Sequence, residues 1–270
     1  MPSGFRRAAV CCLAACCLAS LAFAQTQVDA PSNDDDDRGL RFFSGYRFHL
    51  NAAALLDDDE RFNWDADYGG EIDVVDYGRG RVHFVANFET ILGEELRRFD
   101  PNQGNYTLAG SMTYRLGSTE VAGTFHHISR HLGDRPKNFP IDWNMAGVQV
   151  WQPADFDRWH VDLRGRAFYT TQRSFVDYDG ELGGDARLRY ALNDRLAVLF
   201  GGAFTYIPTD ADIAGRSSVW GGGFETGLRI EADAVAIEIF MGVQRRIDAD
   251  PLEREARTWA MTGFRLLSRD

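Results

Sequence analysis

The sequence predicts an all-β protein, a transmembrane antiparallel up-and-down β-barrel of about twelve strands. Three observations predict this fold. Apolar side chains recur at every second residue over segments of roughly ten to fourteen residues, which is longer than most strands of soluble proteins. The polar positions between them carry charges of both signs, as a polar lumen would. Short and long connections also alternate along the chain, as periplasmic turns and external loops do in outer-membrane barrels.

The alternation begins in segment 40–50, where apolar side chains from Leu40 to Leu50 alternate with arginine, glycine and histidine. A soluble β-sandwich also alternates, but its strands are usually shorter and its polar face meets bulk water. Aromatic residues such as Trp64 and Trp159 lie near segment ends, where membrane barrels carry aromatic girdles. The later segments are 64–74, 81–92, 105–116, 121–129, 141–152, 159–169, 181–190, 196–206, 224–231, 235–244 and, less regularly, 256–267.

The connections between these segments place both chain ends on one side of the membrane. Long external loops alternate with short turns, so the strand number is even and both termini are periplasmic. Short turns are expected at 77–80, 117–118, 153–157, 193–194 and 231–233. Long loops are expected at 51–61, 93–104, 130–140, 171–180, 207–217 and 247–255.

Charged side chains at the inward positions are expected to pair with one another. A barrel of about twelve strands has a modest lumen, which long side chains can fill. We therefore expect a closed barrel rather than a wide pore. The residues concerned are Arg41, Arg47, Asp65, Asp67, Glu71, Asp73, Arg164, Arg166, Arg187 and Arg189.

The N-terminal residues 1–24 have the features of a secretory signal peptide. A basic pair, Arg6 and Arg7, precedes an apolar run at 8–21. A small-x-small cleavage site follows at 22–24. All four cysteines lie inside this segment, so a mature chain would have no disulfide. An alternative is lipoprotein processing at Cys16. The expected destination is the outer membrane of a Gram-negative bacterium.

Residues 25–38 are expected to be a disordered periplasmic segment, and residues 39–270 the barrel. The segment 25–38 is polar, lacks apolar periodicity and ends in four aspartates at 34–37. The net charge is −11, and it becomes −13 when the two arginines of the signal peptide are removed from the 29 basic residues while all 40 acidic residues stay. Such an acidic chain is not expected to bind nucleic acid.

The segment 124–134 concentrates residues with catalytic chemistry: three histidines, a serine and an aspartate. His127 and Ser129 share the parity of Phe125, so on a strand all three side chains face the lipid. Polar groups on that face are costly away from the membrane interface. An imidazole beside a hydroxyl is the minimum for base-activated nucleophilic attack. A pair on the outer wall suits a substrate that arrives in the membrane plane, such as a lipid ester.

His127-x-Ser129 at a barrel rim, followed by a polar loop and Trp143-Asn144 on the next strand, resembles the outer-membrane phospholipase A family. The resemblance implies a twelve-stranded barrel in which Ser129 is the nucleophile, His127 the general base and Asn144 the residue that orients the histidine. Lipid A deacylases use a similar His-x-Ser with an acidic third member, for which Asp142 is the candidate. The implied partners are outer-membrane lipids, phospholipid or lipid A, while calcium and a homodimer are left open.

The longer run from His127 to Asp134 resembles a bacterial outer-membrane β-barrel family marked by His-x-Ser-Ser-His-Leu-Gly-Asp. Arg130 replaces the second serine of that motif here. The phospholipases continue their serine with Asn-Gly, which this chain lacks. The resemblance covers the motif region alone, and the rest of the chain shares only the barrel pattern.

The third member of the catalytic group poses a difficulty for the hydrolase interpretation. Asn144 and Asp142 have the parity opposite to Trp143 and Met145, so they are expected to face the lumen. A bulge near Gly147, or an inverted orientation of the strand, would place them outside instead. The nearest candidate for an oxyanion donor is the backbone N–H that follows the serine, which belongs to Arg130.

Other interpretations of the same residues remain open. His127, Ser129, His131 and Asp134 could form a non-catalytic hydrogen-bonded network that orders the loop. His126, with His131 and Asp134, could bind a divalent cation. The acidic loop 57–60 could hold calcium or could simply be solvated. Two classes of function therefore stand: a membrane-lipid hydrolase, and a non-enzymatic barrel that is structural or forms a narrow transport conduit.

Overall fold

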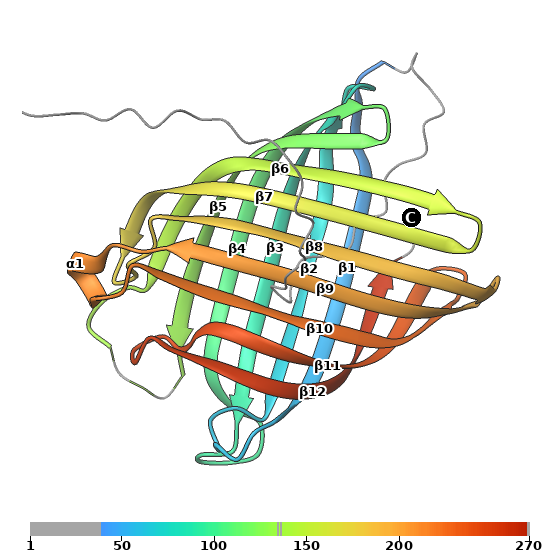
Figure 1. Ribbon diagram of the computed structural model, residues 1–270. Helices are drawn as coiled ribbons and strands as arrows, with labels where there is room; N and C mark the ends of the chain where they lie inside the picture. The colour runs from blue at the N-terminus through green and yellow to red at the C-terminus, as the bar shows by residue number, and fades with distance from the viewer. Residues whose placement is uncertain (1–38, 134, 136, 269–270) are drawn as a thin grey trace, which may run out of the picture.

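The structure is a computed structural model that describes residues 39–133, 135 and 137–268. The expected signal peptide, the acidic segment and Asp134 lie outside the described residues. Twelve strands form one closed antiparallel barrel in which each strand pairs with its neighbours in sequence and β1 pairs with β12 (Figure 1). The predicted fold class is confirmed. No helix of the described residues is long and apolar enough to span a membrane.

The strands run from 13 to 17 residues and extend beyond the segments that apolar alternation marked. Backbone pairing continues past these segments, so residues 51–56, which were expected to begin a loop, belong to the first strand. The strands are β1 Arg41–Leu56, β2 Trp64–Asp76, β3 Arg81–Gly93, β4 Asp100–Leu116, β5 Thr119–Leu132, β6 Asp142–Phe156, β7 Trp159–Ser174, β8 Gly180–Asn193, β9 Leu196–Pro208, β10 Ser218–Glu231, β11 Val235–Asp250 and β12 Glu255–Ser268.

The alternation of long and short connections is confirmed. The turn expected at 153–157 is shorter, because β6 runs through Pro153 and turns at 157–158. Gly117 has φ 64° in a two-residue turn, a conformation that glycine adopts without steric cost. The six connections that were expected to be long share one end of the barrel, although the last of them is no longer than the turn at 77–80; they lie at 57–63, 94–99, 133–141, 175–179, 209–217 and 251–254. One of them contains a single helical turn, α1 Ala211–Ala214, which the sequence pattern did not predict.

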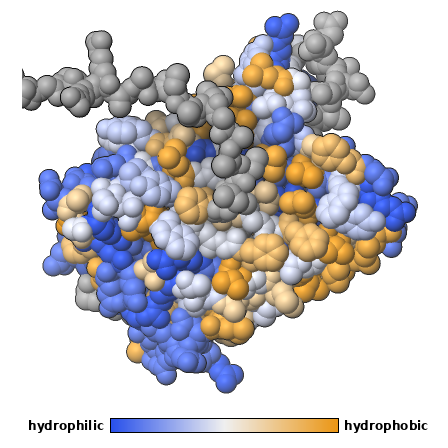
Figure 2. Space-filling model, in the orientation of Figure 1, coloured by the Kyte–Doolittle hydropathy of each residue, from blue (hydrophilic) through white to orange (hydrophobic). Residues whose placement is uncertain are grey.

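The two faces of each strand differ as a membrane barrel requires. On β5, Thr124 and His126 are buried toward the lumen, whereas Phe125 between them is 50% exposed on the outer wall. Hydrophobic side chains gather over the strands in Figure 2, and hydrophilic ones lie at the left and the bottom, where long connections are found. The period of two in the sequence therefore separates a lipid face from a lumen face.

A group of ion pairs lies in the lumen around Glu238, whose side chain is completely buried. Its carboxylate contacts Arg187 at 2.5 Å, Arg265 at 2.8 Å and Arg229 at 3.1 Å. Glu225 pairs with two of the same arginines. A buried carboxylate is tolerated when guanidinium groups surround it in this way.

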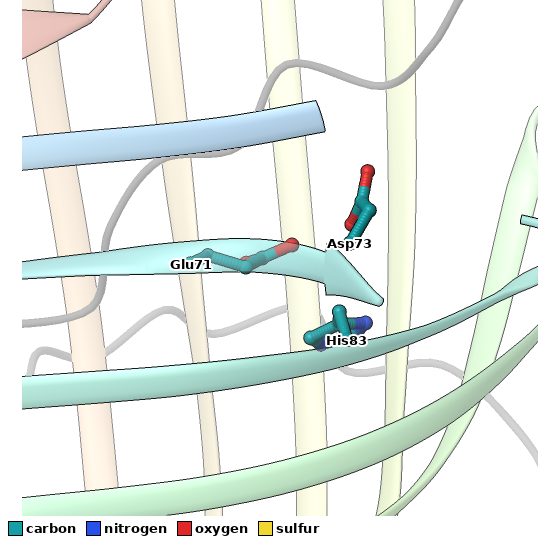
Figure 3. Close-up of side chains that lie close together, drawn as sticks. All are labelled: Glu71, Asp73 and His83. Atoms are coloured by element: carbon teal, nitrogen blue, oxygen red, sulfur yellow. The ribbon is translucent and has the colours of Figure 1, made fainter. Parts of the chain in front are cut away.

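A second group joins β2 and β3 and includes Glu71, Asp73 and His83, whose ligand-type atoms lie within 4.8 Å of one another (Figure 3). The Arg81 guanidinium lies 2.6 Å from both carboxylates, and Arg47 lies 2.7 Å from Glu71. Cationic side chains therefore already occupy the space between the two carboxylates. The remaining lumen charges expected from the sequence also have polar or charged partners in the barrel.

The lumen is not filled throughout. A cavity of about 250 Å³ lies beside the second group, with Trp143, Trp151 and His126 among its lining residues. At the loop end, the Arg216 side chain bridges Asp177 and Asp248 at 2.7 Å each. The expectation of a packed, charge-paired lumen holds at the ion-pair groups and is wrong at the cavity, where side chains of the facing strands do not meet.

We expect the purified protein to show no large, steady conductance in planar bilayers. The reason is that ion pairs join non-adjacent strands and loops inside the lumen, around Glu238 and around Arg216. Single-channel recording at moderate voltage is the measurement, with an open porin as positive control. Steady openings of porin size would contradict an occluded lumen.

Replacing Glu238 should destabilise the barrel strongly. Glu238→Ala leaves three buried arginines without their shared carboxylate, and the loss of one partner of a buried ion pair costs about 3–5 kcal/mol. The free energy of unfolding in urea, measured in lipid vesicles, reports the change. Asp233→Ala in the exposed turn between β10 and β11 is the control and should stay within about 0.5 kcal/mol of wild type.

Candidate active site on the outer wall

The candidate site lies where β5 and β6 meet near the loop end of the barrel. The strand register pairs His127 with Asn144 and Ser129 with Asp142. The Arg130 N–H donates to the Ile141 carbonyl at 2.8 Å, which marks Ser129 and Asp142 as a pair without direct backbone hydrogen bonds. Side chains of such pairs lie closer than those of hydrogen-bonded pairs. The same holds two residues along, so His127 and Asn144 also stand close together.

Asn144 and Asp142 lie on the outer wall, which corrects the expectation that they face the lumen. Both are half-buried and share the outward face of Val148, which is 51% exposed. Trp143 and Met145 are the inward residues, with exposures of 4% and 0%. The strand thus has the inverted orientation, and its register with β5 is unbroken at Gly147.

An aromatic cluster inside the barrel explains this orientation. The Trp143 ring packs edge-on against Tyr178 with ring centroids 5.2 Å apart. It also receives the Arg130 guanidinium over its face at 5.2 Å. Ile141, Met145 and Phe168 complete a buried apolar group at the loop end of the lumen. Apolar parity therefore does not mark the lipid side there, because the lumen itself contains an apolar core.

Three side chains form a relay across β5, β6 and β7. The His127 Nδ1 lies 2.7 Å from the Asn144 Oδ1, and the Asn144 Nδ2 donates to the Gln172 Oε1 at 2.9 Å. With the amide nitrogen directed to Gln172, the amide oxygen faces the imidazole and can only accept. A neutral His127 that donates to this oxygen carries its hydrogen on Nδ1 and keeps a lone pair on Nε2, which is the tautomer of a general base.

A bulge in β7 brings Gln172 into this relay. The register between β6 and β7 shifts after Asn144, which leaves Thr171 as the extra residue. The Thr171 hydroxyl donates to the Asn144 carbonyl at 3.2 Å. Bulges often redirect a side chain beside an active site. Gln172 was absent from the sequence prediction, since a two-residue period gives no sign of a bulge on a neighbouring strand.

Ser129 has its hydrogen bond with a different imidazole. The Ser129 Oγ lies 3.0 Å from the Nε2 of His131, two residues further along the same outer face. Among the described residues, no hydrogen bond joins Ser129 to His127. The His131 ring packs edge-on against Tyr106 with ring centroids 5.3 Å apart. Ser129 thus stands between two histidines, one at each side along the strand.

Two of the metal interpretations are not supported by the arrangement of side chains. His126 points into the lumen and packs against Phe168 at 4.7 Å, whereas His131 is exposed on the outer wall. The two imidazoles lie on opposite faces of the strand, so His126 and His131 cannot bind one metal ion together. In the acidic loop, Arg61 donates to Asp59 and lowers the pKa of that carboxyl to about 2. Arg257 contacts the same carboxylate at 2.8 Å, so arginines already neutralise this part of the loop.

The oxyanion donor expected from the sequence is occupied. The backbone N–H of Arg130 is the group that donates to the Ile141 carbonyl in the β5–β6 ladder. A strand amide that is committed to a ladder hydrogen bond cannot also serve a developing oxyanion. That expectation is therefore wrong.

Comparison with solved structures identifies the type of barrel. Outer membrane phospholipase A from Escherichia coli matches with a TM-score of 0.51 and 11% identity, over 83% of this chain and 92% of that chain. The calcium-bound phospholipase dimer of Salmonella typhi matches with a TM-score of 0.50 and 10% identity, over 83% and 90%. The protein is a bacterial outer-membrane type of β-barrel. At this identity the similarity shows the fold alone.

LpxR from Salmonella typhimurium is also similar, with a TM-score of 0.48, 8% identity, and coverage of 83% of this chain and 100% of that chain. No protein-family model matches the chain, and no curated protein sequence matches it.

The relay predicts a measurable tautomer. In protein with ¹⁵N-labelled histidine at pH 8, His127 should show a protonated Nδ1 and an unprotonated Nε2, because the Asn144 Oδ1 accepts from Nδ1. Asn144→Ala should return the ring to a mixture of tautomers, while His160→Gln at the opposite end should leave the His127 signals unchanged. A wild-type His127 that is protonated on Nε2 would contradict the relay.

Proposed function

We propose that the protein is a serine esterase that hydrolyses acyl esters of outer-membrane lipids in the membrane plane. One observation supports this above the others: His127 is held in the general-base tautomer by Asn144 and Gln172 beside Ser129 on the lipid-facing wall. Ser129, His127 and Asn144 then correspond to a nucleophile, a general base and an orienting group. The Asn144 side-chain amide occupies the position beside the histidine that an aspartate carboxylate occupies in serine proteases.

The position of Ser129 suits a lipid substrate. It lies near the end of β5, between the apolar outer wall and the polar loops. Acyl ester groups of lipids lie in the same interfacial zone, between the hydrocarbon core and the headgroups. Polar side chains on the outer face cost little at that depth. By likeness to the phospholipase barrels of the same fold, a phospholipid is the first substrate to test, and lipid A is the second.

The proposed reaction proceeds in two steps. The Ser129 hydroxyl turns to His127 and loses its proton to Nε2 as Oγ bonds to the ester carbonyl carbon. The carbonyl π electrons move to oxygen, and on collapse the alkoxide of the lipid leaves with the proton from His127. Water then attacks the acyl-serine and gives its proton to His127. Fatty acid departs and the Ser129 hydroxyl is restored.

Asn144 fits the orienting role better than Asp142. Asn144 is bonded to His127, whereas Asp142 stands opposite Ser129 in the register. The alternative class, a non-enzymatic barrel, is favoured by the hydrogen bond between Ser129 and His131. In that case the histidines and the serine only order the rim of the barrel.

Fatty acid release separates the two classes. Wild type in mixed micelles is expected to release fatty acid from labelled phospholipid or lipid A, with calcium and with chelator as separate arms. Ser129→Ala and His127→Ala should each lower kcat by about 10³-fold or more, because nucleophile and base act as a unit. All variants should still fold, as judged by heat-modifiable migration. If wild type is inactive on both lipids, or Ser129→Ala is as active as wild type, the protein is not this esterase.

The choice of orienting residue is tested separately. Asn144→Ala should lower kcat by about 10²-fold, because a displaced imidazole loses its alignment with the serine. Asp142→Ala is the matched variant, on the same face of the same strand, and should have a smaller effect. A larger loss in Asp142→Ala would assign the orienting role to the acid instead.

A further inference from the structure

We infer that His131 is a catalytic residue of this site, the donor of the hydrogen bond that stabilises the oxyanion. The inference rests on the proposed esterase function and adds a residue to it. It starts from the hydrogen bond of 3.0 Å between the His131 Nε2 and the Ser129 Oγ. In this role an imidazole N–H, rather than a backbone amide, donates a hydrogen bond to the negatively charged oxygen of the tetrahedral intermediate.

A donor is required because ester hydrolysis places a full charge on the former carbonyl oxygen. Loss of one such donor typically costs about 10²–10³-fold in kcat. In many hydrolases backbone amides on loops serve as donors, but Ser129 lies within a strand that is paired on both sides. The amide that follows it is committed to Ile141. The donor must therefore come from a side chain near the Ser129 Oγ.

The two histidines flank Ser129 from opposite sides along one face of β5, at positions 127 and 131. His127 is oriented by Asn144 to present a lone pair, which suits it to accept the serine proton. A serine hydroxyl has one hydrogen. When that hydrogen points to His127, the contact with His131 requires Nε2–H to be the donor and Oγ the acceptor.

The Nε2–H of His131 can donate first to the serine and then to the oxyanion, without transferring its proton. As Oγ bonds to the carbonyl carbon, the π electrons move to the carbonyl oxygen, which is then bonded to the same carbon as Oγ. The Nε2–H of His131 moves its hydrogen bond from Oγ to that oxygen. Neutral imidazole can serve as such an electrophile in enzymes. His127 holds the transferred proton throughout, so the two rings have different roles.

Packing against Tyr106 favours this placement of the His131 ring. The Tyr106 ring, on the facing strand opposite Ser129, packs edge-on with His131 at 5.3 Å between centroids. The Phe88 ring packs on the other side of Tyr106, with ring centroids 4.8 Å apart. The His131 ring is therefore positioned by packing while Nε2 remains directed at the serine.

Substitutions that keep or remove the donor test the role. His131→Ala should lower kcat for lipid hydrolysis by about 10²–10³-fold with KM little changed. His131→Gln offers an amide N–H but no base, and should recover much of the lost kcat. The rate of labelling by a fluorophosphonate, in which the Ser129 Oγ displaces fluoride from phosphorus, should follow the same order. His160→Gln, at the turn end, is the control and should match wild type.

The outcomes separate this inference from the proposed function. Wild type that hydrolyses lipid and labels at Ser129, together with a fully active His131→Ala, overturns the role of His131 and leaves the esterase intact. A His131→Gln variant as impaired as His131→Ala overturns the donor role as well. Wild type without hydrolysis or labelling overturns both. Loss in His131→Ala with recovery in His131→Gln supports the oxyanion donor.

Discussion

The closed backbone ladder is the constraint on which the rest of this structure depends. Hydrocarbon offers no partner to an N–H or C=O group, so a sheet that spans a membrane must close on itself. Pairing of β1 with β12 achieves this for the described strands. Once the ladder is closed, each side chain has only two possible directions, lipid or lumen. The period of two along each strand then separates the two faces, except where a bulge interrupts it.

The closed ladder explains both which side chains meet at the candidate site and which backbone donor the site lacks. Register alone sets His127 against Asn144 as a close pair, and a bulge in β7 adds Gln172. The same ladder occupies the Arg130 amide, so a backbone oxyanion hole of the usual kind cannot form at Ser129. Side chains must supply what backbone amides supply on loops. That explains why a second imidazole, His131, has chemical significance here.

Inside the lumen the main constraint is the cost of burying charged side chains. The lumen carboxylates and guanidinium groups are withdrawn from bulk water, and each isolated charge would be costly. They are arranged as shared contacts, such as Glu238 with three arginines, rather than as isolated pairs. The apolar group at the loop end packs Trp143 and Met145 into the lumen, which leaves Asn144 between them directed outward. Lumen packing and the outer site are thus linked through one strand.

The sequence by itself determined the barrel, the approximate strand number, the alternation of turns and loops, and the outward direction of His127 and Ser129, because all of these depend on local periodicity. Only the tertiary structure decided the direction of Asn144, since an aromatic core inside the lumen reverses the usual meaning of an apolar residue. The contact of Gln172 with Asn144 also depended on contacts between strands. Periodicity describes one strand at a time, whereas these contacts depend on register and bulges between strands.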